Sequence, residues 1–126
     1  MNIQKRVVAV KLLPAILNSK NERLFLAELQ AYLNVARPRI VLDGTLLRKL
    51  DRSGIHLLLC CLEEAIKRNG DVKLAALPPG TEALLEFTGV SRVFEIYDTT
   101  VEAVNSFDAL PGEVIYDRKH ATENAA

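Results

Sequence analysis

The spacing of hydrophobic and polar positions changes twice in the first third of the chain. Residues 7–13 are rich in β-branched and aliphatic side chains and are followed by Pro14, which predicts a strand that leads into a loop. From Glu22 onwards apolar residues recur at helical spacing, which predicts an amphipathic helix that ends before Pro38. Residues 39–43 are almost entirely apolar, as is typical of a central strand covered on both faces.

A second helix is expected over residues 53–69, and the Asn69-Gly70 pair ends it. Its apolar residues occupy positions 55, 58, 59, 62, 65 and 66, and the other faces of its first two turns carry Leu57, Cys60 and Cys61. Because the first half of this helix has no polar face, we expect it to be the most buried helix of the fold. Leu59 is accordingly expected to be a core residue whose replacement by alanine costs ~2 to 5 kcal/mol.

The alternation of strands and helices continues through the second half of the chain. Residues 72–77 and 93–97 are predicted strands, and residues 81–88 form a short helix that is stopped by Gly89. Thr99 and Glu102 have the spacing of a capping box and open a last helix. Parallel neighbouring strands need crossover connections, so the pattern predicts an α/β fold: a mixed, mainly parallel sheet of four to five strands with helices packed against it.

The chain is expected to hold one domain over residues 1–110 and a tail over residues 111–126. A chain of 126 residues can bury a single core without a metal ion or disulfide. The tail is expected to be largely disordered, and mobile after Arg118, because its last residues are polar. Residues 113–116 are the exception, since they can form a strand along an open edge of the sheet.

Composition and charge narrow the classes of function. Sixteen basic residues balance sixteen acidic ones, so no overall field attracts nucleic acid and direct nucleic-acid binding is not expected. The longest apolar run, residues 57–62, is far below the ~20 residues that cross a bilayer, so no membrane span is expected. The adjacent Cys60 and Cys61 suit neither zinc ligation nor an ordinary disulfide, and predict small core residues of a reduced, cytoplasmic protein.

No residue pattern predicts catalysis. The sequence has no glycine-rich phosphate loop and no pair of histidines at metal-ligand spacing. His56 at the start of the buried helix fits capping or packing better than a base, and His120 lies in the tail. A nucleophilic Ser53 or Cys61 would need an orienting base that the sequence does not propose. We therefore expect no enzyme activity and no cofactor.

The most informative stretch is residues 41–55, VLDGTLLRKLDRSGI, in which a strand ending in aspartate is followed by a loop and an Asp-x-Ser-Gly turn that opens a helix. A second segment, LEFTGVSRVFEIY at residues 85–97, and the helix containing residues 101–104 follow in order. Over residues 5–107 this arrangement resembles the STAS domain family, and in particular its anti-sigma factor antagonists. The two segments at their proper separation carry the resemblance, because Asp-x-Ser-Gly alone is a short motif.

The resemblance implies a regulatory function. Such an antagonist binds an anti-sigma factor of the serine-kinase type and frees a sigma factor, and phosphorylation of the serine before the glycine, here Ser53, reverses this. ATP and magnesium would belong to the partner. Asp51 matches the aspartate of the motif, and Asp43 matches the aspartate that ends the preceding strand. STAS domains also associate with membrane transport proteins, including lipid-trafficking complexes, so a transporter accessory subunit is the alternative.

A partner-binding surface is expected around Ser53. Its expected members are Asp43, Arg48, Lys49, Asp51, Arg52, Ser53, Gly54 and His56. Either Ser53 or Asp51 can cap the helix, and Gly54 permits close approach of a partner backbone or of a neighbouring strand. The cations at positions 48, 49 and 52 form either a solvated loop or a collar that attracts an acidic partner.

Three positions depart from the common pattern of the family. Gly44 replaces an aliphatic residue, Arg52 replaces a serine and His56 replaces a small residue. The edge strand that often precedes the first strand in the family is expected to be short or missing in this chain.

Overall fold

A five-stranded sheet forms the middle layer of the protein. The computed structural model describes residues 7–118. The sheet contains β1 (Val8–Leu12), β3 (Arg39–Asp43), β5 (Asp71–Ala75), β6 (Ile96–Tyr97) and β7 (Val114–Asp117). Its strand order is β6-β5-β3-β1-β7, and every neighbouring pair is parallel. The predicted α/β fold with a mainly parallel sheet is confirmed.

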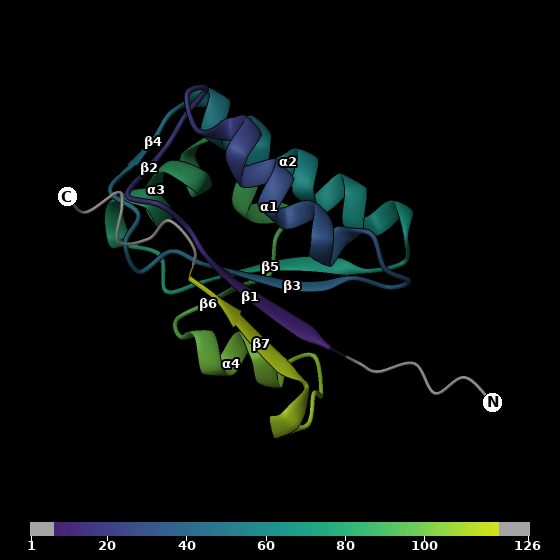
Figure 1. Cartoon of the computed structure of the whole chain (residues 1–126). Helices are drawn as coiled ribbons and strands as arrows, with labels where there is room; N and C mark the ends of the chain where they lie inside the picture. The colour runs from purple at the N-terminus through teal and green to yellow at the C-terminus, as the bar shows by residue number, and fades with distance from the viewer. Residues whose placement is uncertain (1–6, 119–126) are drawn as a thin grey trace.

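Helices cover both faces of the sheet (Figure 1). The helices α1 (Glu22–Leu33), α2 (Arg52–Lys67) and α3 (Pro79–Phe87) lie on one face, and α4 (Thr100–Asn105) lies on the other. Two short 3-10 helices are η1 (Val90–Arg92) and η2 (Pro111–Glu113). A separate parallel pair, β2 (Ile16–Leu17) and β4 (Lys49–Leu50), forms in segments that the sequence pattern predicts as loops.

The side chains of each strand alternate between two apolar clusters. On β3, Ile40 and Leu42 belong to the cluster under α1, α2 and α3, whereas Val41 belongs to the cluster under α4. Successive side chains of a strand point to opposite faces, so a strand covered on both sides is apolar throughout. Burial on both faces thus explains why residues 39–43 of β3 form a nearly unbroken apolar run.

The buried face of α2 differs in phase from the predicted stripe. Its buried residues are Gly54, Leu57, Leu58, Cys61, Leu62 and Ala65. The predicted burial of the helix is confirmed, but Leu59 is only partly buried and Ile66 is exposed. The first two turns of α2 are apolar nearly all round, so the sequence pattern does not indicate which of their faces is buried. The packing of the helix on the sheet selects that face.

The segment after α3 also differs from the prediction. Residues 93–97 were expected to be one strand, but the strand β6 begins only at Ile96. Gly89 has a φ of 80° and starts the 3-10 turn η1, after which Phe94 is buried in the core under α3. Because Phe94 packs into this core, pairing with β5 begins after it, and the Glu95 carbonyl accepts the first hydrogen bond, from the Leu74 amide at 3.0 Å.

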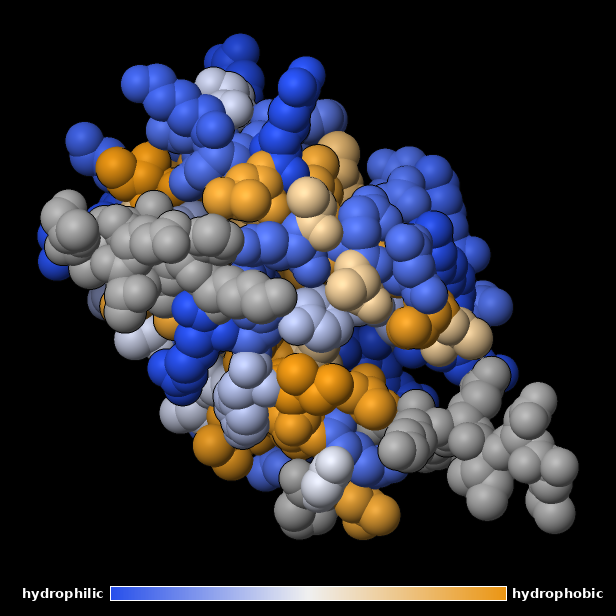
Figure 2. Space-filling model, viewed as in Figure 1, coloured by the Kyte–Doolittle hydropathy of each residue, from blue (hydrophilic) through white to orange (hydrophobic). Residues whose placement is uncertain are grey.

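The C-terminal strand predicted at residues 113–116 is confirmed as β7. It pairs in parallel with the outer edge of β1, and Val10 lies opposite both Val41 and Tyr116. The strand thus forms one edge of the five-stranded sheet. Apolar side chains gather over β7 and α4 in the lower part of Figure 2, and Val101 and Ile115 are exposed members of these two elements. The residues after Arg118 that were expected to be mobile, His120 among them, lie outside the described residues.

Candidate partner-binding site

The turn before α2 shows which residue caps the helix. Asp51 has an extended backbone, and its Oδ1 accepts the amide proton of Gly54 at 2.9 Å. The N-cap is therefore Asp51, and Ser53 is the second residue inside the helix. This arrangement decides between the two capping residues that the sequence leaves open, and it frees the Ser53 hydroxyl from the capping role.

Ser53 lies half-buried in the first turn of α2. Among residues 7–118 no hydrogen bond to its hydroxyl is found. The first turn of a helix has free amide groups and a positive potential, so a phosphate group on this serine would be tolerated by the helix itself. The position combines an available hydroxyl with a local field suited to its phosphorylated form.

Gly54 fixes the start of α2 against the chain's own strand β2. A Cβ atom at Gly54 would lie 2.3 Å from the Leu17 carbonyl oxygen and 2.6 Å from Leu50 Cδ1. Since no side chain fits in this space, the glycine is required by the contact of α2 with the small β2–β4 sheet. The close approach expected at this position is therefore to a neighbouring strand.

Three cations surround the turn in sequence and remain exposed in the structure. Arg48, Lys49 and Arg52 are exposed, and within residues 7–118 none of them forms an ion pair. Their backbone is nevertheless held in place, because the amides of Arg48 and Lys49 both donate to the Ala15 carbonyl, at 2.7 and 3.1 Å. The positive side chains are thus presented to solvent from a fixed backbone.

A hollow of about 350 Å³ opens beside the same turn. It is lined by Arg48, Lys49, Leu50, Asp51, Gly80, Thr81 and Leu84. These residues come from β4 and Arg48 just before it, from the cap of α2 and from the first two turns of α3. The sequence places α3 and β4 about 30 residues apart, so only the fold brings these side chains together.

Asp43, one of the residues expected at the binding surface, has a mostly buried side chain. It is buried, its Oδ1 accepts the Thr45 amide at 2.9 Å, and its Oδ2 accepts the Thr100 hydroxyl at 3.1 Å. The carboxylate therefore joins the loop after β3 to the start of α4, which is a structural role. Gly44, which follows Asp43, lies in a tightly packed place, since a Cβ atom there would come within 2.6 Å of Leu77 Cδ2.

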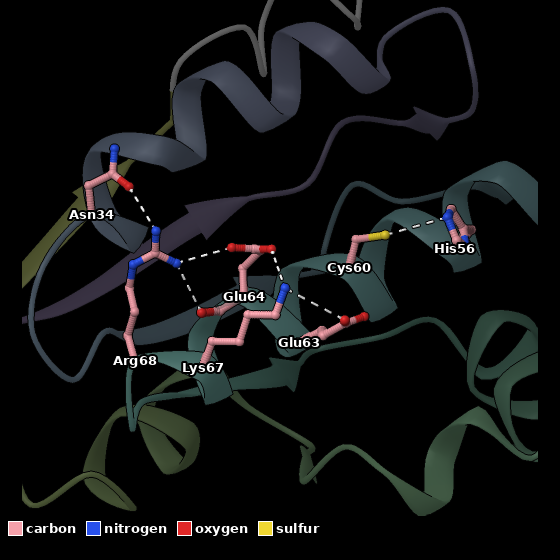
Figure 3. Close-up of polar contacts among 7 residues, drawn as sticks. All are labelled: Asn34, His56, Cys60, Glu63, Glu64, Lys67 and Arg68. Atoms are coloured by element: carbon pink, nitrogen blue, oxygen red, sulfur yellow. Dashed lines mark hydrogen bonds and ion pairs between the residues drawn. The ribbon is translucent and has the colours of Figure 1, made fainter.

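His56 and Cys60 continue the same side of α2 beyond Ser53. Positions 53, 56 and 60 follow the spacing of neighbours on one helix face. Cys60 Sγ lies 3.4 Å from His56 Nε2 (Figure 3). One helical turn after Cys60, Glu64 forms surface ion pairs with Lys67 and Arg68. His56 is exposed, so it remains available to a partner that covers Ser53.

The two cysteines differ in environment although they are adjacent. Cys61 is buried in the main core, and burial raises its pKa to about 12. Cys60 is only half-buried, so the expectation that both are core residues is wrong for Cys60. Its pKa is also raised, first by burial and then by nearby Glu63. A thiol needs a lowered pKa to act as a nucleophile near neutral pH, so neither side chain is activated.

Phe87 is an exposed apolar residue that the sequence pattern did not predict to lie at the surface. It is 91 % exposed at the end of α3, whereas Leu85 in the same helix is fully buried. The helical spacing of α3 contains the information needed to predict this exposure. Residues 81 and 85 share the buried side of the helix, whereas residues 84 and 87 share another side.

Two absences hold for the part of the chain that the structure describes. No three His, Cys, Asp or Glu side chains within residues 7–118 are grouped closely enough to hold a metal ion. No helix in that range is long and apolar enough to pass through a membrane.

Together, the all-parallel sheet, the capped Ser-Gly turn and the exposed cations define a small α/β domain with a half-buried hydroxyl in the first turn of α2. Residues 4–97 match the family model described as Mlab, STAS domain. The chain belongs to the STAS domain family.

Individual relatives include proteins named as anti-sigma factor antagonists. BtrV of Bordetella bronchiseptica, which carries that name, is 27 % identical over 100 residues, covering 79 % of this chain and 86 % of BtrV. A Thermotoga maritima structure described in the same words has a TM-score of 0.71 at 25 % identity, covering 79 % of this chain and 87 % of that one. The Bacillus cell fate determinant SpoIIAA, solved in its phosphorylated form, has a TM-score of 0.62 at 20 % identity, covering 83 % and 95 % of the two chains, and shares the fold.

Proposed function

We propose that this chain is an anti-sigma factor antagonist that binds an anti-sigma factor of the serine-kinase type and is released by phosphorylation of Ser53. The observation that carries the proposal is the Ser53 hydroxyl, which lies in the first turn of α2 without a hydrogen bond from residues 7–118. Asp51 caps the helix, so the serine is not needed to hold the turn. The names of BtrV and of the Thermotoga maritima protein support the choice of partner.

The switch follows from charge and desolvation. A phosphate group adds a charge of about −1.5 to −2, and a partner that buries the unmodified hydroxyl would have to desolvate that charge. Desolvation of an unpaired charge costs several kcal/mol, and every ~1.4 kcal/mol lowers the affinity about tenfold. A single modified hydroxyl can therefore separate two proteins without any change of fold.

The residues around Ser53 have distinct roles in this proposal. Asp51 and Gly54 hold the turn, while Arg48, Lys49 and Arg52 attract carboxylates of the partner. His56, exposed one turn further along, contacts the same partner surface. The catalytic groups, ATP and magnesium belong to the kinase, and this chain acts as its substrate in the cytoplasm without touching nucleic acid.

The proposal is tested by mixing the purified chain with the kinase-type anti-sigma factor of the same organism. Binding affinity and intact mass are measured with and without ATP and magnesium. The wild type should gain the mass of one phosphate and lose affinity, whereas Ser53→Ala should keep both its mass and its affinity. Thr45→Ala, which removes the hydroxyl of an exposed residue in the loop after β3, serves as a control that should be phosphorylated like the wild type.

An unchanged mass and affinity of the wild type with ATP would contradict the phosphorylation switch. Absence of binding in either condition would contradict the choice of partner. Co-purification with a transporter ATPase instead would favour the role of a transporter accessory subunit.

A further inference from the structure

The solvent-facing side of α3 carries apolar residues that are not buried in the core of the domain. Phe87 is 91 % exposed, Leu84 is half-buried, and Gly80 is exposed. Residues 80, 84 and 87 lie on one side of the helix, since their spacing is four and then three. We call this set the α3 stripe. A nearly fully exposed phenylalanine in line with a second apolar residue is typical of an interaction surface.

The α3 stripe leads into the hollow beside the Ser53 turn. Gly80 and Leu84 line the hollow of about 350 Å³ together with Leu50 and Asp51. A volume near the lower end of the range for ligand pockets accommodates one or two apolar side chains. Asp51 lines the hollow and also caps α2, so the hollow lies beside the turn that carries Ser53. A partner that covers Ser53 therefore also reaches the hollow.

The charges around the hollow indicate the chemistry of its occupant. Arg48 and Lys49 line it and are exposed, and neither forms an ion pair within residues 7–118. Of the acidic residues of α3, Glu82 lies on the opposite side of the helix from Gly80 and Leu84, and Glu86 is turned by about 100° from Phe87. A ligand in the hollow therefore meets apolar groups, the cations Arg48 and Lys49, and the Asp51 carboxylate, whose Oδ1 already accepts the Gly54 amide.

We propose that the α3 stripe and the hollow bind a segment of the anti-sigma factor in which an aliphatic or aromatic side chain is flanked by acidic residues. The apolar side chain enters the hollow against Leu50 and Leu84, and the carboxylates face Arg48 and Lys49. Phe87 packs on the same segment further along α3. This inference rests on the proposed function, and it adds a second contact region that does not depend on the Ser53 hydroxyl.

Two glycines provide a matched test. A Cβ atom at Gly80 or at Gly112 has nothing within 4 Å, so both sites accept a side chain without internal contact. Gly112 lies in η2 before β7, at the opposite edge of the sheet from β6, and Gly80 lies in the first turn of α3. Gly80→Glu and Gly112→Glu change the net charge equally, and only the first places a carboxylate in the hollow.

The experiment measures the affinity of each variant for the kinase-type anti-sigma factor of the same organism, without ATP. Gly80→Glu should weaken binding about 10-fold or more, as replacement of a central contact does, while Gly112→Glu should bind like the wild type. Phe87→Ser should weaken binding about 5-fold or more. Thermal melts followed by circular dichroism confirm that each variant is folded, and Gly80→Gln separates the effect of bulk from that of charge.

Equal affinities of the wild type, Gly80→Glu and Phe87→Ser would overturn this inference and leave the proposed function standing. A wild type that binds no anti-sigma factor would overturn both. Sedimentation of the chain alone is the remaining measurement. A wild-type dimer that becomes monomeric in Gly80→Glu would overturn the inference in favour of a second copy as the occupant.

Discussion

Asp51 and Ser53 lie two positions apart at the start of α2, and the structure gives them separate tasks. Asp51 holds the turn through its bond with the Gly54 amide. Ser53 contributes only its half-buried hydroxyl, and the exposed Arg52 lies between them. The Asp-x-Ser-Gly motif can be recognised in the sequence. The sequence does not show which side-chain oxygen accepts the Gly54 amide, because aspartate and serine both cap helices well.

Substitution of Ser53 should separate the effects of charge and of shape. Ser53→Ala should bind the anti-sigma factor like the wild type and resist inactivation by ATP. Ser53→Asp should weaken binding less than phosphorylation does, because it adds one charge instead of nearly two and the nearby cations partly neutralise it. Calorimetric titration of the two variants and of the phosphorylated wild type measures the order. An aspartate variant that binds as weakly as the phosphoprotein would contradict the role of charge magnitude.

The buried thiol of Cys61 should make stability fall in alkaline solution. Its pKa is about 12 in the folded protein against 9.0 for an ordinary thiol, and burial is the first cause. Above about pH 9 the unfolded chain releases this proton while the folded chain retains it, so the free energy of unfolding decreases as pH rises, by about 1 kcal/mol per pH unit. Urea melts between about pH 8 and pH 10 measure the slope. Cys61→Ala should show a shallower slope, and an unchanged slope would contradict the assignment.

At the scale of elements, α2 shows how packing selects among apolar positions. Leu57 and Leu58 are fully buried, whereas Leu59 is partly buried and Ile66 is 57 % exposed. The pattern predicted burial of the helix correctly and placed the buried face about one position away. An apolar helix turn can pack on several sides, and the sheet below α2 and the helix α1 beside it choose one of them.

Alanine substitutions along α2 should follow this face. Leu58→Ala should lower the free energy of unfolding by about 2 to 5 kcal/mol, because it removes a fully buried side chain and leaves a cavity. Leu59→Ala should cost clearly less, since part of that side chain is already in contact with water. Denaturant melts of the two variants provide the comparison. Equal losses would indicate that Leu59 is as buried as its neighbour.

At the scale of the whole molecule, two lysines are buried on opposite faces of the sheet. Lys11 on β1 is 1 % exposed, and its Nζ lies 2.8 Å from Glu28 of α1 and 3.4 Å from Asp117 of β7. Tyr32 of α1 donates to the same Asp117 at 2.7 Å. These contacts join the first strand, the first helix and the last strand, and they hold β7 at the edge of the sheet.

Lys73 on β5 occupies the other face. Its Nζ lies 2.7 Å from the Ser106 hydroxyl, 4.2 Å from the centre of the Phe107 ring and 2.9 Å from Glu95. The Glu95 side chain is mostly exposed, whereas both carboxylates beside Lys11 are nearly buried. The carboxylates that contact Lys11 are therefore much less accessible to water than the carboxylate that contacts Lys73.

Replacement of each lysine by methionine should give unequal losses of stability. Lys11→Met removes the cation that lies between two nearly buried carboxylates, and should cost about 3 to 5 kcal/mol. Lys73→Met leaves a carboxylate that water already reaches, and should cost less than half as much. Urea melts give the two values, and hydrogen exchange should show faster exchange of the β7 amides in Lys11→Met only. Equal losses would contradict the dependence on buried carboxylates.

The sequence by itself determined the order of the main elements, the class of fold, the family and the position of Ser53. These properties depend on local spacing, turn residues and a contiguous motif, and such signals are carried by neighbouring residues. The tertiary structure alone decided that Asp51 is the cap, that Asp43 is buried, that Lys11 and Asp117 meet across 106 positions, and that α3 and β4 enclose a hollow. Such contacts join segments distant along the chain, so they exist only once the sheet order is set.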